Sequence, residues 1–127
     1  MSNALLDKVS AHIAAQGYET GLTVKYHRYS DKDLDGKTNF ICYRRAGDGG
    51  SNVLLQATDV NIVLVTSPNS VQMGDDLMTN ILKLFRNSTV QAGIVRFDPV
   101  GNVRGPRRLE NGRPLWELTV RCYTENE

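Results

Sequence analysis

The chain has 127 residues, a length that fits one domain of ordinary size, and 40% of them are hydrophobic, enough for a core. Its 15 basic and 14 acidic residues give a formal net charge of +1, so no general attraction to nucleic acid or to anionic membranes is expected. The longest apolar run, Ile62-Val63-Leu64-Val65, is far too short to span a bilayer. The first residues show no export signal. We therefore expect a protein that is made in, and initially stays in, a cytoplasm and does not enter a membrane.

The N-terminal third predicts one helix and two strands. Residues 4–16 predict a short amphipathic helix, which Gly17 ends. The apolar stripe of this helix consists of Leu5, Leu6, Val9 and Ile13. Apolar and polar residues then alternate from Leu22 to His27, and an apolar segment follows at residues 40–43. Such short alternating or apolar segments are typical of strands.

The middle of the chain predicts a turn, a long strand and a second helix. Gly47-Asp48-Gly49-Gly50 indicates a turn, and residues 53–66 indicate one long strand or a bent pair. Pro68 breaks that run. The apolar stripe of the second helix consists of Leu77, Ile81, Leu84 and Phe85. Gly74 weakens the first turn of this helix, so we expect its ordered part to begin near Asp75.

The last third predicts two strands, at residues 91–97 and 115–123. Trp116, Leu118, Val120 and Cys122 share one face of the last strand. Because most strands follow one another without a crossover helix, the chain is expected to be a single α+β domain, residues 1–127. We predict a mainly antiparallel sheet of four to five strands with both helices on one face. The expected core residues are Val24, Ile62, Leu64, Leu77, Ile81, Phe85, Leu118 and Val120.

Residues 98–114 are predicted to form a long flexible hairpin between these strands. The segment combines three glycines and three prolines with four arginines, Arg104, Arg107, Arg108 and Arg113. Loops of this length in small domains are usually functional or disordered. A solvated hairpin and a surface that docks a partner protein are both compatible with this composition. Specific binding of nucleic acid is not expected, because no aromatic side chain is interleaved for base stacking.

An acidic segment, Asp31-Lys32-Asp33-Leu34-Asp35-Gly36, matches the opening of a calcium-binding loop. The twelfth position of such a loop requires a bidentate Glu, and here it is Cys42. A solvated turn is therefore expected, with a weak cation site at Asp31, Asp33 and Asp35 as the alternative. Calcium is predicted to bind weakly or not at all.

No pattern in the chain predicts catalysis. Cys42 and Cys122 lie in apolar segments and are expected to be small core side chains. His12 and His27 lie on different elements, without the repeated spacing of metal ligands. No nucleophile–base pair or phosphate-binding motif is present. The sequence therefore predicts neither an enzyme nor a cofactor or resident metal.

The order of elements resembles the tail terminator proteins of long-tailed bacteriophages, the lambda-like minor tail proteins. A short N-terminal helix, a long strand ending in Thr66-Ser67-Pro68, an apolar helix and a final alternating strand at residues 112–120 carry the resemblance. It implies a non-catalytic virion protein that forms a hexameric ring on the last ring of tube protein. Such a ring stops tube polymerisation and presents a surface for a head-completion or connector protein.

Two other functions remain open at this point. The first is a different phage neck or tail-completion protein of similar size, and the second is a small binding domain that uses the arginine-rich segment. If the chain forms a ring of head-to-tail contacts, each subunit needs two different complementary surfaces. The clusters Asp31/Asp33/Asp35 and Arg104/Arg107/Arg108 have opposite charge and are candidates for such surfaces.

Overall fold

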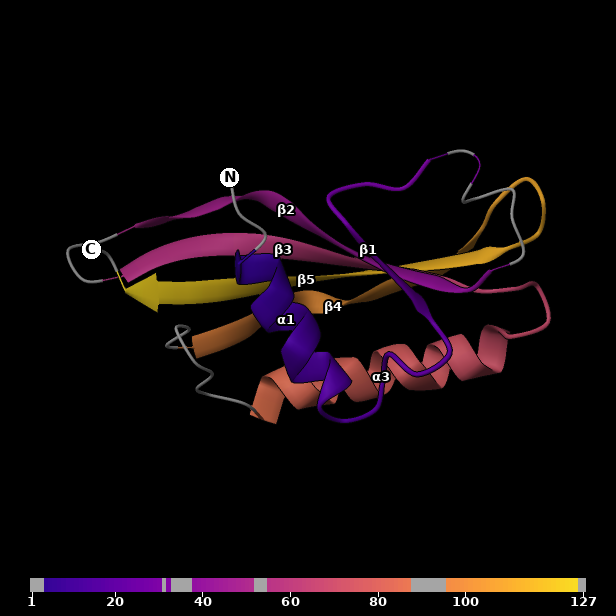
Figure 1. Ribbon diagram of the computed structural model, residues 1–127, viewed down its shortest axis with the longest axis horizontal. Coiled ribbons are helices and arrows are strands. Elements are labelled where there is room, and N and C mark those ends of the chain that lie inside the picture. The colour runs from indigo at the N-terminus through magenta and orange to yellow at the C-terminus, as the bar shows by residue number, and fades with distance from the viewer. Residues whose placement is uncertain (1–3, 31, 33–37, 52–54, 88–95, 126–127) are drawn as a thin grey trace.

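The structure is a computed structural model that describes residues 4–30, 32, 38–51, 55–87 and 96–125 (Figure 1). Its helices are α1 (Ala4–Ala14) and α3 (Val71–Asn87). Its strands are β1 (Thr23–Tyr26), β2 (Phe40–Ser51), β3 (Leu55–Val65), β4 (Arg96–Arg108) and β5 (Pro114–Glu125). They form one sheet in the order β1-β2-β3-β5-β4, in which only the β1–β2 pair is parallel. The predicted α+β class with a mainly antiparallel sheet is confirmed.

Both helices cover the same face of the sheet, as predicted (Figure 1). The core between them joins apolar residues of α1 and α3 to the inward positions of the strands. Its members include Leu6, Val9, Ile13, Ile41, Tyr43, Val60, Ile62, Leu64, Met78, Ile81, Phe85, Phe97, Trp116, Leu118, Val120 and Cys122. Of the expected core residues, only Val24 and Leu77 are half-buried. Val24 lies on the short edge strand β1, and Leu77 lines a groove described below.

Helix α3 begins at Val71, one turn earlier than the Asp75 predicted from Gly74. The helix needs a glycine at position 74 because the indole ring of Trp116 packs directly against its backbone, and a Cβ there would overlap the ring. The indole Nε1 also donates a hydrogen bond to Oδ1 of Asp75 at 2.7 Å. Tertiary packing against β5 therefore offsets the low helix propensity of Gly74.

The glycines at 47–50 do not form the predicted turn but lie inside β2. The register between β2 and β3 shifts between Arg45 and Gly47 and again between Asp48 and Gly50. Glycines are common at such bulges because they lack a side chain that would have to pack. Strand β3 is correspondingly one continuous strand rather than a bent pair.

The predicted loop at 98–114 is largely strand: β4 extends to Arg108, and the connection to β5 is confined to residues 109–113. The register between β4 and β5 shifts between Val100 and Arg104 and between Arg104 and Arg107. A Cβ on Gly105 would lie 2.5 Å from the carbonyl oxygen of Leu115, so only glycine fits this close approach. Edge strands tolerate glycine, proline and bulges because only one of their sides is paired.

Arg113 differs from the other three arginines of this segment because it is buried, with 2% of its surface exposed. Its guanidinium donates hydrogen bonds to the carbonyl oxygens of Thr38 and Thr66, and it lies over the ring of Phe40. Burial lowers the pKa of this guanidinium. The prediction that Arg113 faces a partner is therefore wrong: it ties the hairpin connection to the start of β2 and the end of β3.

The contact between Gly74 and Trp116 predicts the effect of one methyl group. Gly74→Ala should destabilise the protein by about 1–3 kcal/mol through overpacking, although Ala gains about 1 kcal/mol of helix propensity over Gly. Urea unfolding measures this loss. In a Trp116→Leu background the same substitution should become neutral or stabilising, because the ring is gone. An equal loss in both backgrounds would contradict the contact.

The hydrogen bonds of Arg113 predict a stability loss that its exposed neighbours do not share. Arg113→Met keeps an apolar side chain over Phe40 but removes the donors to Thr38 and Thr66, and should cost about 2–4 kcal/mol in free energy of unfolding. Arg107→Met on the same hairpin is the matched control and should change stability by no more than about 0.5 kcal/mol. Equal unfolding midpoints for the two variants would show that Arg113 does not hold the hairpin.

Candidate assembly surfaces

The sheet face opposite the helices carries a network of charged and polar side chains. Arg121 on β5 forms an ion pair with Asp59 on β3, with 2.8 Å between Nε and Oδ1, and this hydrogen bond raises the pKa of the guanidinium. Glu117 accepts a hydrogen bond from Asn61 at 3.0 Å. Arg44 on β2 and Arg104 on β4 approach the same Glu117 carboxylate at 3.7 and 3.8 Å. The network crosses four strands, and its opposite charges largely compensate one another.

Next to this network, the same face carries a small apolar cluster. Phe40, Cys42, Val63, Val65 and Leu115 are buried there, and Tyr29 and Leu109 pack against them. The segment before β2 and the hairpin connection thus cover one end of the helix-free face, where Arg113 also lies. Arg44 lies over the ring of Tyr29 at the border of the two regions, 5.7 Å from its centroid.

Three predicted contact residues lie on β4 at one edge of the sheet, on what we call the arginine arm, residues 100–108. Arg104, Arg107 and Arg108 are all exposed, as predicted. The guanidinium of Arg104 approaches Glu117, and Arg108 donates a hydrogen bond to the carbonyl oxygen of Gly112 at 2.7 Å. The side chain of Arg107 makes no hydrogen bond or ion pair with any residue that the structure describes. The arm also presents Val100, whose surface is 43% exposed.

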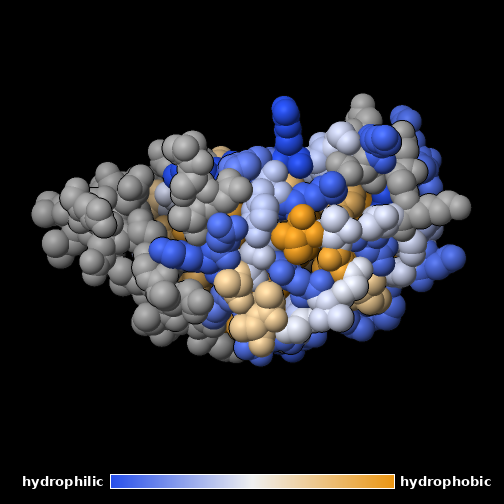
Figure 2. All heavy atoms as spheres, in the orientation of Figure 1, coloured by the Kyte–Doolittle hydropathy of each residue, from blue (hydrophilic) through white to orange (hydrophobic). Residues whose placement is uncertain are grey.

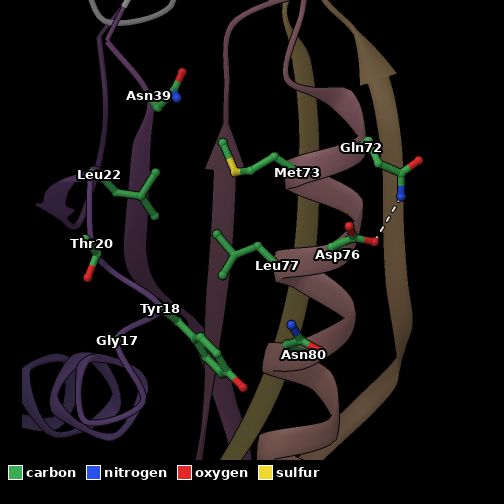
Figure 3. Close-up of a pocket in the computed structure, with 11 residues that line it drawn as sticks. Gly17, Tyr18, Thr20, Leu22, Asn39, Gln72, Met73, Asp76, Leu77 and Asn80 are labelled. Atoms are coloured by element: carbon green, nitrogen blue, oxygen red, sulfur yellow. Dashed lines mark hydrogen bonds between the residues drawn. The ribbon is translucent and has the colours of Figure 1, made fainter.

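A groove of about 700 Å³ lies on the helix-bearing side of the molecule, between α3 and the segment that leads into β1 (Figure 3). Met73 and Leu77 point from α3 toward Leu22 and Tyr18 across the groove. Its polar lining residues are Thr20, Asn39, Gln72, Asp76 and Asn80. On this helix-bearing side, a few apolar side chains reach the surface among mainly hydrophilic ones (Figure 2). Met73 is 42% exposed, so the groove presents apolar surface to solvent.

The buried thiols and the buried hydroxyl of Tyr43 lie among core residues or in hydrogen bonds between elements of the fold. Cys42 and Cys122 are free and buried, and burial raises the pKa of the Cys122 thiol to about 12, which confirms the interpretation of both as core residues. Tyr43 donates a hydrogen bond to Glu19 at 2.6 Å, and Ser10 donates to the same carboxylate. Burial raises the pKa of Tyr43. This cluster joins α1, the segment before β1 and β2, and so holds one wall of the groove against the sheet.

The predicted acidic cluster Asp31, Asp33 and Asp35 lies outside the described residues, so its calcium affinity stays a prediction. Within the described ranges, no three His, Cys, Asp or Glu side chains come together as a metal site. None of the helices described is long and apolar enough to cross a membrane.

Comparison with known proteins agrees with the resemblance seen in the order of elements. The fold is similar to that of a chain in the virion of a native gene transfer agent particle, with a TM-score of 0.58 and 15% identity. The superposition covers 94% of this chain and 93% of that chain, and it concerns the fold alone. No curated protein matches the chain. The model of a family described as phage tail termination protein matches residues 2–126, which makes the chain a structural component of the virion tail. The chain therefore belongs to the phage tail termination protein family.

Proposed function

We propose that this protein forms a homo-oligomeric ring, six-fold in symmetry, that caps the completed tail tube. The ring stacks on the last ring of tube protein, stops its polymerisation and presents a surface to a head-completion or connector protein. Family membership supports the tail location and the structural role. The ring itself is supported by one observation, the presence of two different exposed surfaces on one subunit, the arginine arm and the groove.

Those two surfaces are what a closed ring of head-to-tail contacts requires. The arginine arm lies on β4, which is one edge strand of the sheet. The groove lies between α3, which packs on β4 and β5, and the segment before β1, which is the other edge strand. A two-fold dimer would use one surface twice, whereas a ring uses one surface to meet a different one. Because the arm and the groove are different surfaces, they favour a ring over a symmetric dimer.

The proposed role is assembly rather than chemistry. The two buried thiols lack access to a substrate, and the charged network on the helix-free face is compensated within the sheet. The arginine arm can engage a protein surface, because guanidinium groups bind carboxylates bidentately while their stems pack on apolar atoms.

The arm should be needed for termination but not for folding. Replacing Arg104, Arg107 and Arg108 together by Ser should leave the melting temperature nearly unchanged, since all three side chains are exposed. The same variant should give overlong tubes, or tails that do not join heads, when tail length is measured by electron microscopy.

A matched control replaces three exposed cations elsewhere, Arg28, Arg45 and Lys83, by Ser. This control should terminate tails normally, which separates the position of the arm from the loss of three positive charges. Tails of normal length and full infectivity from the arm variant would remove the arm from the mechanism.

A further inference from the structure

The arginine arm and the groove are complementary in charge. Asp76 is the one charged residue among the described residues that line the groove, and it accepts a hydrogen bond from Gln72 at 2.9 Å. It forms no ion pair with any residue in the described part of the chain. The side chain of Arg107 on the arm also forms no ion pair in the described part of the chain. The arm thus presents Arg107, a cation without a counterion, and the groove presents Asp76, an anion without one.

The arm and the groove are also complementary in apolar surface. Among the described residues, the large hydrophobic side chains that are exposed are Met73 and Val100. Met73 lines the groove, and Val100 lies on β4. Each surface therefore combines one exposed apolar side chain with charge, and the positive charge of the arm is opposite in sign to Asp76 of the groove. Arginine stems add apolar surface that can cover the groove residues Leu22 and Leu77.

The lengths of the two surfaces agree. The groove follows α3 from Gln72 to Asn80, a distance of about 12 Å at 1.5 Å per helical residue. Val100 and Arg107 lie opposite Thr119 and Leu115 on β5, four residues apart, which corresponds to about 13 Å. The arm can therefore span the groove from one end to the other.

We propose that the groove of one subunit receives the arginine arm of the next copy of this chain, with Val100 packed near Asn80 and Arg107 at the Gln72 end, from which its long side chain reaches along one helical turn to pair with Asp76. This inference rests on the proposed ring and names the surfaces that build it. Because arm and groove are two different surfaces of one subunit, the contact repeats from subunit to subunit in one direction and can close.

Reversing the charges one at a time tests this pairing. Asp76→Arg places Arg against Arg107, and Arg107→Asp places Asp against Asp76. Each variant alone should raise the protein concentration needed for half-assembly by about tenfold or more, because like charges are brought together at every contact. Light scattering over a concentration series and negative-stain imaging measure this shift, and an unchanged melting temperature shows that each variant is folded.

Mixing the two variants gives the decisive result. In an alternating ring, Arg107 of the Asp76→Arg subunit faces the native Asp76 of the Arg107→Asp subunit. At the next contact, the introduced Asp faces the introduced Arg. An equimolar mixture should therefore regain ring formation, and so should the variant that carries both changes. Thr79→Arg and Arg28→Asp introduce the same two side chains at exposed positions outside the two surfaces and should assemble like the native chain, alone and mixed.

Cross-linking tests the same contact independently of charge. With Cys42 and Cys122 buried, the double variant Asn80→Cys/Val100→Cys should give, on oxidation, a ladder of disulfide-linked species up to the complete ring. Either substitution alone should give none of the higher members. Native rings combined with unaffected single charge variants and no ladder would overturn the arm-in-groove contact and leave the proposed ring standing. A native chain that stays monomeric at every concentration would overturn both.

Discussion

The seating of Trp116 on Gly74 determines where the exposed surfaces of this protein lie. The indole ring occupies the space that a side chain at position 74 would fill, and its hydrogen bond to Asp75 fixes the start of α3 over β5. With position 74 against the sheet, Met73 and Leu77 fall on the side of the helix that faces the segment before β1. The groove is therefore a direct result of how closely one helix approaches one strand.

The charged groups of the sheet divide into two sets with different consequences. Glu117 and Asp59 compensate Arg44, Arg104 and Arg121 within the helix-free face. Exposed or half-exposed pairs of this kind add little to stability, but they leave the network of five charges with an excess of only one positive charge. Beyond the network, Arg107 lies near the end of β4, where no carboxylate of the described residues pairs with it. The local charge of the arm is thus a matter of position, because the net charge of the chain is only +1.

The class of fold could be predicted from the sequence because the spacing of apolar residues is clear in both the helices and the strands. Apolar spacing in α3 and alternation in β5 indicated the core face of each, and Trp116, Leu118 and Phe85 are buried as expected. The arginine-rich segment misled because glycine and proline argue against strands in general, whereas an edge strand accepts them at bulges. Arg113 misled because charge usually indicates exposure, although a guanidinium with carbonyl partners can be buried. The groove could not be predicted, since its two walls are about fifty residues apart; the one local signal was Met73, four residues before Leu77.

The bulges and prolines of β4 also determine how subunits are able to meet. A long edge strand with free amide and carbonyl groups invites pairing with the edge of any other sheet, and such pairing has no natural end. Pro99 and Pro106 lack an amide hydrogen, and two register shifts interrupt the regular spacing of the remaining groups. Strand addition along this edge is therefore blocked, and contact is left to side chains. A subunit of this kind is protected against open-ended strand pairing, the kind of contact that builds fibres.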